Sequence, residues 1–224
     1  MPVARFAIRE TLGIVVMGVA LFWSSGTLDW WPAWALLSVL VWWVAATAWV
    51  IVRFHPSLLP ERLGPVKGAK GWDTAIMSAV GMLSLVQFVV AGFDLRFGWT
   101  PAVPAAAQPV GLSLSIFGYG LGIWALAYNP FFSQIVRIQV ERNHTVATGG
   151  PYRYVRHPAY VGTILFQVAV PMLLASWWAL IPGGLTVLLL LVRTALEDRT
   201  LHAELQGYSD YAQDVRHRLI PGIW

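Results

Sequence analysis

The residues best suited to chemistry lie in the segment GGPYRYVRHPAYVG, residues 149–162, between two apolar stretches. It holds two arginines, one histidine and three tyrosines, and its prolines restrict the backbone. Pro158 suits the first turn of a helix, where a missing N–H costs nothing. The free N–H groups and dipole of that helix would attract a carboxylate or another anion. Tyr160 would add a ring and a hydroxyl, and Gly162 room for a ligand.

A second pair of ionisable residues, Arg193 and Glu197, follows the last long apolar stretch. Residues four apart share one face of a helix, so both side chains are expected to point the same way. An exposed ion pair would contribute little to stability. Ionisable groups at a membrane boundary, however, usually face a cavity. The residues alone leave both interpretations open.

Other constellations in the sequence predict no chemistry. The glycine-rich GYGLG at 118–122 lies inside an apolar stretch, whereas a dinucleotide fingerprint needs a preceding strand. Gly118 and Gly122 are therefore expected to let two helices approach closely. The absence of cysteine excludes disulfides and thiolate metal sites. No metal site is expected, since metal-ligand spacing is lacking among His144, His157, His202 and His217.

The composition predicts an all-α, polytopic membrane protein. Of the 224 residues, 57% are hydrophobic and 12% charged, where a soluble domain would carry about a quarter charged residues. The stretch 159–192 would be about 50 Å long as one helix, too long for a hydrocarbon core of roughly 30 Å, so it is expected to form a hairpin of two spans. About six spans of roughly 20 residues each are expected, near 7–23, 32–52, 73–91, 110–128, 158–174 and 177–194.

The distribution of basic residues predicts the orientation. If the N-terminus is cytoplasmic, fourteen Lys and Arg side chains lie on the cytoplasmic side and only Arg96 lies outside. Both termini, and a site at residues 149–162, would then be cytoplasmic, in a cell inner membrane or an endomembrane. This distribution also explains the pI of 9.7 without a nucleic-acid partner. The fourteen are Arg5, Arg9, Arg53, Arg62, Lys67, Lys70, Arg137, Arg142, Arg153, Arg156, Arg193, Arg199, Arg216 and Arg218.

The C-terminal part, about residues 129–220, resembles the isoprenylcysteine carboxyl methyltransferases and related integral-membrane methyltransferases, including phospholipid N-methyltransferases. The resemblance lies in HTVATGGPYRYVRHPAYVG (144–162), in the pair Arg193 and Glu197, and in the tail GYSDYAQDVRHRLIP (207–221). The resemblance implies that S-adenosyl-L-methionine binds without a Rossmann domain. It also implies a lipophilic acceptor that enters from the bilayer, foremost the carboxylate of an isoprenylcysteine-like substrate.

The resemblance also implies a division of the chain and a set of site residues. Residues 1–110 form transmembrane helices without a recognisable motif, and residues 111–224 form the methyltransferase core, with a cofactor-binding segment at 129–162 and a C-terminal helix at 193–220. Arg193 matches a substrate position, and Arg193 and Glu197 are the expected catalytic residues. Family members can have Gln at the position of Arg137, so nearby Gln139 is an alternative to it. The matched cofactor positions are Arg137, Gln139, His144, Thr145, Val146, Ala147, Tyr152, Arg156, His157, Pro158, Ala159, Tyr160 and Glu197.

Three alternatives to the carboxyl acceptor stay open at this point. A phospholipid (ethanolamine) N-methyltransferase would need a base to deprotonate its amine, with Glu197 or Asp198 as candidates. A small-thiol S-methyltransferase is the second alternative. Membrane sterol reductases, which use NADPH, share His-Pro-x-Tyr but typically have an Asn before the Tyr and an acid soon after it, both missing here. The planar fork of Arg193 favours a carboxylate, and the ring of Tyr152 or Tyr160 could hold a sulfonium by cation–π attraction.

Overall fold

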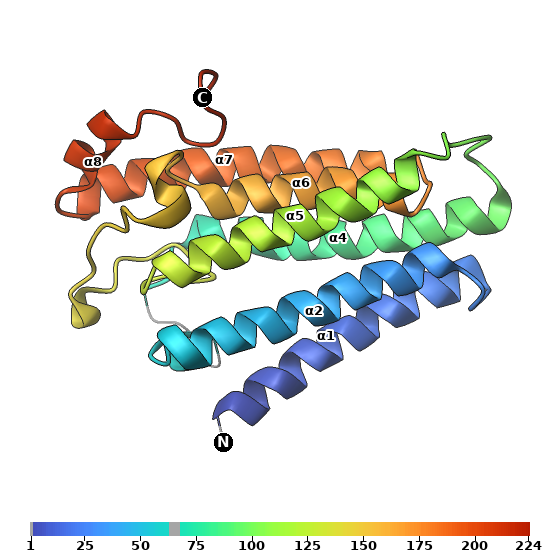
Figure 1. The fold of residues 1–224 in the computed structure, drawn as a ribbon, viewed down its shortest axis with the longest axis horizontal. Helices are drawn as coiled ribbons and strands as arrows, with labels where there is room; N and C mark the ends of the chain where they lie inside the picture. The colour runs from blue at the N-terminus through green and yellow to red at the C-terminus, as the bar shows by residue number, and fades with distance from the viewer. Residues whose placement is uncertain (1, 63–67) are drawn as a thin grey trace.

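The computed structural model describes residues 2–62 and 68–224, and these residues form helices and no strands (Figure 1). Lys67, counted above with the cytoplasmic charges, lies outside the described residues. The all-α fold class is therefore confirmed. The elements are α1 (Pro2–Ser25), α2 (Trp31–Phe54), α3 (Leu58–Glu61), α4 (Gly71–Phe97), α5 (Ala107–Tyr128), the 3₁₀ turns η1 (Val140–Arg142) and η2 (Gly150–Arg153), α6 (Pro158–Leu173), α7 (Leu180–Glu204) and α8 (Tyr208–Asp214).

Five of these helices are long and apolar enough to cross a membrane, namely α1, α2, α4, α5 and α7. The sixth expected span is α6, an apolar helix of only 16 residues, or about 24 Å. The predicted hairpin is confirmed, because α6 ends at Leu173 and α7 begins at Leu180. The turn between them contains Ala175, whose backbone has a positive φ of 56°. Pro171 lies inside α6 and not in the turn.

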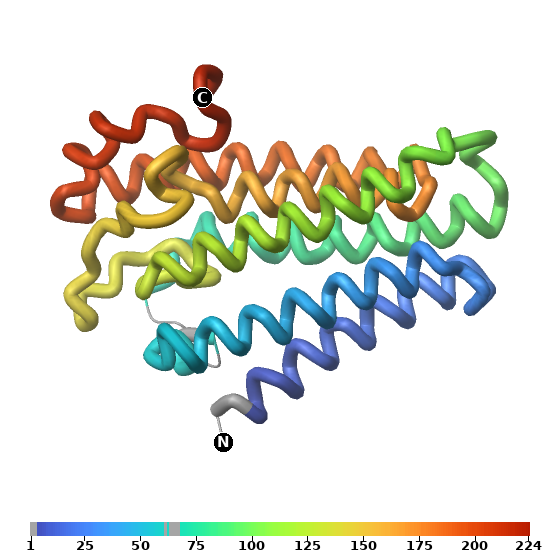
Figure 2. Tube along the Cα trace, in the orientation of Figure 1, coloured from blue at the N-terminus to red at the C-terminus, as the bar shows by residue number. Residues whose placement is uncertain are grey.

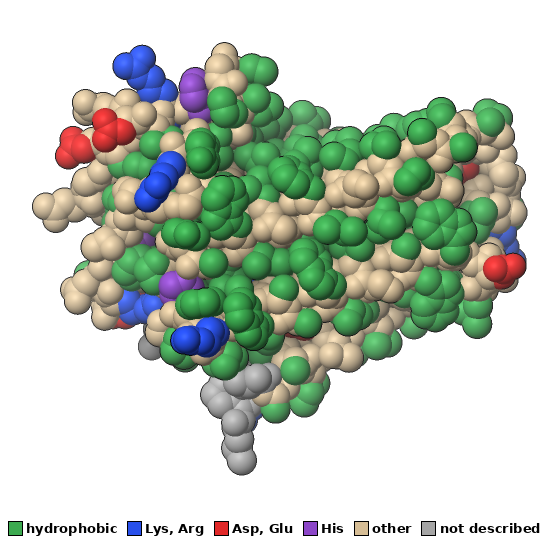
Figure 3. Space-filling view, in the orientation of Figure 1, with side chains coloured by type: hydrophobic (Ala, Val, Ile, Leu, Met, Phe, Trp, Pro, Cys, Tyr) green, Lys and Arg blue, Asp and Glu red, His purple; other side chains and the backbone are tan. Residues whose placement is uncertain are grey.

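The helices form an antiparallel bundle (Figures 1 and 2), and the distribution of side chains in Figure 3 gives it a polar end and an apolar middle. The polar end combines the start of α1, the segment 129–157, the end of α7 and the C-terminal tail. On the face shown in Figure 3, most charged side chains lie at that end, while hydrophobic side chains cover the middle. Large apolar side chains that are half or more exposed, such as Trp23, Trp49 and Phe117, fit a lipid environment.

The tight contact between α5 and α6 depends on two glycines that face each other. A Cβ on Gly162 would lie 2.2 Å from the carbonyl oxygen of Gly118, and a Cβ on Gly118 would lie 2.5 Å from the carbonyl oxygen of Gly162. The prediction that Gly118 permits a close helix approach is confirmed. A Cβ on Gly122 would meet no atom within 4 Å, so Gly122 does not limit the approach. Gly162 was expected to leave room for a ligand; that was wrong, because its space is filled by α5.

The C-terminal segment differs from the single helix expected at 193–220. Residues up to Glu204 continue α7, and a separate short helix, α8, follows. Gly207, with a φ of 80°, reverses the chain between the two helices. After Asp214 the tail lies against residues 156–157: the N–H groups of Arg156 and His157 donate to the carbonyls of residues 217 and 218 at 2.9 and 3.0 Å.

One apolar core joins the regions on both sides of the predicted boundary at residue 110. Leu36 and Phe88, from α2 and α4, pack in the same cluster as Phe166 and Val170 from α6. The division into 1–110 and 111–224 stays a prediction. The two parts pack against each other in one core.

The glycine contact yields a stability prediction. Gly162→Ala should lower the free energy of unfolding by about 1–3 kcal/mol, the usual cost of overpacking, because the new Cβ would meet backbone. Gly120→Ala on α5 is the matched control: its Cβ meets nothing within 4 Å, so stability should be unchanged or slightly raised. Thermal unfolding of both variants in detergent measures this. Equal midpoints for the two variants would contradict the proposed packing role.

Candidate active site

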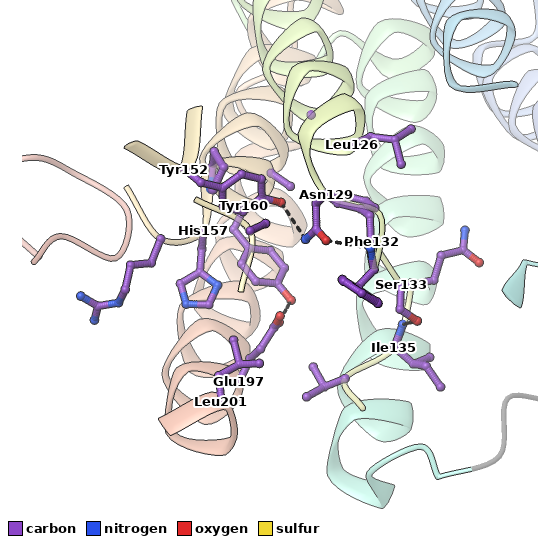
Figure 4. Close-up of a pocket in the computed structure, with 18 of the residues that line it drawn as sticks. Leu126, Asn129, Phe132, Ser133, Ile135, Tyr152, His157, Tyr160, Glu197 and Leu201 are labelled. Atoms are coloured by element: carbon purple, nitrogen blue, oxygen red, sulfur yellow. Dashed lines mark hydrogen bonds between the residues drawn. The ribbon is translucent and has the colours of Figure 1, made fainter. Parts of the chain in front are cut away.

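A cavity of about 570 Å³ opens at the polar end of the bundle (Figure 4). This volume lies within the range of roughly 300–1,000 Å³ typical of small-molecule sites. One wall comes from the segment 129–157, the start of α6 and the end of α7, and the other from α2, α4 and α5. The second wall includes Trp43, Thr47, Met77, Gly118, Tyr119, Gly122 and Leu126.

The structure brings nearly all the predicted site residues to this cavity. Gln139 alone among them does not line it: the side chain is buried, donates to the carbonyl of Phe131 at 2.8 Å and accepts from Arg142. Gln139 therefore stabilises the segment at 129–157 from its interior. Of the two alternatives Arg137 and Gln139, Arg137 lines the cavity. The lining residues from the predicted set are Arg137, His144, Thr145, Val146, Ala147, Tyr152, Arg156, His157, Pro158, Ala159, Tyr160, Arg193 and Glu197.

The motif at 156–160 is positioned by the start of α6. The helix begins at Pro158, as predicted, with His157 as the preceding cap residue. The imidazole Nε2 of His157 lies 3.2 Å from Oδ1 of Asp198 on α7. This contact fixes the ring at the edge of the cavity (Figure 4).

Asp198 is the centre of a buried polar network behind the cavity. Its carboxylate accepts two hydrogen bonds from Arg156, at 2.8 and 3.1 Å, and one from Nε of Arg218 at 2.8 Å. The hydroxyl of Tyr208 donates to it at 2.8 Å. Asp198 does not line the cavity. Donors engage both oxygens of the carboxylate, which disfavours the role of base that the amine alternative would give it.

Tyr160 and Glu197 both line the cavity and contact each other directly. The Tyr160 hydroxyl donates to the Glu197 carboxylate, and both side chains point toward the segment at 132–135 (Figure 4). The guanidinium of Arg193 lies over the Tyr160 ring, 5.2 Å from its centre. Arg193 and Glu197 thus line one cavity, which confirms the expected common face of α7.

Arg193 is bound to a partner that the sequence did not reveal. Its Nε and Nη2 donate to the two carboxylate oxygens of Asp73 at 2.6 and 3.3 Å, and Nη2 also donates to the carbonyl of Gln134 at 2.9 Å. Asp73 in turn accepts from the N–H of Val136 at 2.7 Å. The planar edge expected to hold an acceptor carboxylate is therefore engaged by Asp73. Only Nη1 is without a hydrogen bond to the described residues.

His144 presents a neutral imidazole to the cavity. Burial, reinforced by nearby Arg142 and Arg137, lowers the pKa of His144 to about 4. Its Nδ1 accepts from the N–H of Gln139 at 3.3 Å, and its ring stacks on Phe131 at 4.4 Å between centres. The proton of the neutral ring is then on Nε2. His144 can therefore act as a fixed donor or a flat surface at neutral pH, and not as a cation.

Sequence reasoning missed several cavity residues that lie outside the matched motifs. Asn129 donates to the hydroxyl of Tyr152 at 3.2 Å and accepts from the N–H of Phe131 at 2.9 Å, which fixes the start of the segment. Arg62, which ends α3, also lines the cavity. Asp73, in the first turn of α4, does not line the cavity itself but holds Arg193, which does. An aspartate inside an apolar stretch was the available signal for Asp73; nothing local marked Arg62.

The fold and site together define a helical membrane protein with a ligand cavity at one end of its bundle. Residues 111–203 match the model of the Isoprenylcysteine carboxyl methyltransferase (ICMT) family, so the resemblance predicted from the sequence is confirmed over this segment. A curated relative, the Protein-S-isoprenylcysteine O-methyltransferase of Schizosaccharomyces pombe, is 41% identical over 46 residues. That match covers 20% of this chain and about a fifth of the length of the relative.

A solved structure of a eukaryotic intramembrane Ras methyltransferase (isoprenylcysteine carboxyl methyltransferase) is similar at 18% sequence identity. The alignment covers 96% of this chain and 86% of that one, with a TM-score of 0.49. Among the described residues, no group of three or more His, Asp or Glu side chains is placed to hold a metal ion.

The buried ion pair leads to a prediction with a matched control on the same helix. Asp73→Asn removes the charge that faces Arg193 and should lower stability by about 3–5 kcal/mol, because an unpaired buried arginine remains. Asp94→Asn is the control: Asp94 is equally buried on α4 but lies at the opposite end, with Thr100 and Ser176 as partners. Both variants should unfold at lower temperature, and only Asp73→Asn should also weaken ligand binding in the cavity. Equal effects on binding would show that Asp73 has no special place in the site.

Proposed function

We propose that this protein is an integral membrane methyltransferase that moves the methyl group of S-adenosyl-L-methionine to a carboxylate of a lipophilic, isoprenylcysteine-like acceptor. The observation that supports this most is the composition of the cavity. The ordered segment 144–162, which overlaps the family match, forms one wall, and apolar transmembrane helices form the other. A polar cofactor and a greasy acceptor can meet only where such walls share one space.

The side chains of the polar wall fit the proposed cofactor chemically. S-adenosyl-L-methionine would supply the methyl group of its sulfonium. Its transfer to a carboxylate oxygen would break the carbon–sulfur bond, form an ester and leave a neutral thioether, without moving a proton. Glu197 offers a carboxylate for an amine or for ribose hydroxyls. Tyr152, whose pKa is raised by burial, stays a neutral aromatic surface. The residues proposed to hold the cofactor are the matched cofactor positions that line the cavity, which leaves out Gln139; Arg193 is proposed for the substrate.

The proposed role of the protein groups is positioning, since holding two reactants in line can supply much of the acceleration. Asp73 fixes the plane of Arg193, whose Nη1 would be left for the substrate. Tyr160 and Glu197 constrain each other through their hydrogen bond. An amine acceptor is disfavoured, because it would need a base. Asp198 is saturated by donors, and Glu197 already accepts from Tyr160.

The proposal includes a sidedness: the polar end of the bundle, both termini and the cavity lie on the cytoplasmic side. The concentration of Lys and Arg at the polar end supports this. A soluble cofactor would then enter directly from the cytoplasm, and the acceptor would enter from the bilayer past the apolar wall.

Cofactor binding is the first test. Purified protein in detergent should bind S-adenosylmethionine or S-adenosylhomocysteine, and His157→Ala should weaken binding about tenfold or more through loss of one buried polar contact. His202→Ala is the control, since His202 also approaches Asp198, at 3.8 Å, but lies outside the cavity. Its affinity should change less than about twofold. Calorimetry that shows NADPH binding and no S-adenosylmethionine binding would replace this proposal with the reductase alternative.

Topology can be tested with single cysteines, because the chain contains none. Gln206→Cys lies after α7 at the polar end, and Ala105→Cys lies before α5 at the opposite end; both positions are exposed. A membrane-impermeant maleimide should label Ala105→Cys in intact cells and Gln206→Cys only after lysis. The reverse pattern would place the cavity on the outer side.

A further inference from the structure

Arg62 is a buried arginine at the end of α3, and its side chain is only 5% exposed. Its guanidinium makes no hydrogen bond or ion pair with the described residues, and its Nε is completely enclosed without a partner. The contact it makes is with the ring of Phe132, whose centre lies 6.0 Å from the guanidinium carbon. Arg9 and Glu10 of α1 are the nearby charges, and neither forms an ion pair with it. Burial lowers the pKa of Arg62 to about 10, so the side chain is still a cation at neutral pH.

The other buried arginines near the cavity differ from Arg62 in this respect. Arg156 is paired with Asp198, and Arg193 is paired with Asp73. Arg142, which is only partly buried, also has partners: it donates to the side chains of Gln139 and Ser57 and to a backbone carbonyl. A buried charge without a partner is costly, and native proteins pair such groups with an opposite charge. The missing partner of Arg62 is therefore expected to be an anion that arrives with a ligand.

The position of Arg62 indicates which ligand carries that anion. Arg62 lines the cavity, and α3 packs into an apolar cluster with Val50, Ile51 and Leu126 of α2 and α5. Phe132, whose ring Arg62 contacts, also packs against this cluster. The motif residues proposed to hold the cofactor come from the segment after it, from α6 and from α7. An anion at Arg62 would thus sit where an apolar tail can extend along α2 and α5.

We infer that Arg62 binds the carboxylate of the amphiphilic acceptor and sets the preference for an acid over a neutral lipid. This assignment rests on the proposed function and refines it. Arg193 cannot offer a complete planar edge, because Asp73 engages it. Nε of Arg62 is enclosed, so its terminal nitrogens would bind one carboxylate oxygen and leave the second oxygen for the methyl donor. Arg62 is a specificity residue in this arrangement, and Arg193 orients the reacting end.

Binding of a matched pair of ligands tests the assignment without relying on turnover. The probes are N-acetyl-S-farnesylcysteine and its carboxamide, which share the apolar tail and differ in the charge. The wild-type protein should prefer the acid, and Arg62→Met should lose about ten- to hundredfold in affinity for the acid while its affinity for the amide is unchanged. Arg62→Lys should retain part of the preference, because it keeps the charge but not the planar fork. Arg53→Met, an exposed arginine at the end of α2, is the control and should behave as wild type.

Two further readouts separate this role from others. If the anionic partner of Arg62 belongs to a ligand, Arg62→Met should raise the unfolding temperature of the ligand-free protein, because it removes an unpaired buried charge. If Arg62 has a purely structural role, the same variant should lower the unfolding temperature. S-adenosylhomocysteine affinity should stay within twofold in Arg62→Met. A large loss there, with the acid preference intact, would assign the anion to the cofactor carboxylate and overturn the inference. If wild type binds neither farnesyl ligand, the proposed function itself fails.

Discussion

The ion pair between Asp73 and Arg193 is the contact on which the site depends. It joins the first turn of α4 to α7 near the polar end of the bundle. Both partners also hydrogen-bond the backbone of the segment at 134–136. A buried pair persists only when further hydrogen bonds satisfy its remaining groups, and here the segment supplies them. The same contacts that neutralise the arginine therefore close one side of the cavity. The N-terminal helices, which carry no recognisable motif, are thereby part of the site.

A second charged centre, Asp198, performs the equivalent task for the C-terminal tail. Arg156 from the motif and Arg218 from the tail share its carboxylate, so the tail is held against the start of α6. The three residues of the motif Arg156-His157-Pro158 thus have different roles. Arg156 binds Asp198 and borders the cavity, His157 connects Asp198 to the cavity, and Pro158 begins the helix. The order of these residues matters because each faces a different environment.

Local signals in the sequence predicted the parts that depend on neighbours along the chain. The start of α6 at Pro158, the hairpin after it, and the common face of Arg193 and Glu197 all follow from spacing and backbone preference. Partners distant in sequence were beyond such signals: 120 residues separate Asp73 from Arg193. Gly162 and Gln139 illustrate the same limit. Both residue types suit a ligand site. In the structure, however, Gly162 permits the close packing of α5 and α6, and Gln139 is buried inside the segment at 129–157. Only the three-dimensional contacts distinguish these roles.

The pairing of carboxylates across the site restricts the acceptor chemistry. Methylation of a protonated amine requires a base to take the proton. Asp73 and Asp198 are bound to arginines, which leaves Glu197, already an acceptor for Tyr160, as the remaining carboxylate of the three. A carboxylate acceptor is already ionised at neutral pH and needs only a cation and a fixed position. The described residues supply what that reaction needs: an unpaired arginine beside an apolar wall, and a second arginine locked in plane by its own partner. Under the proposed function, the charge balance of the cavity would favour an acidic amphiphile.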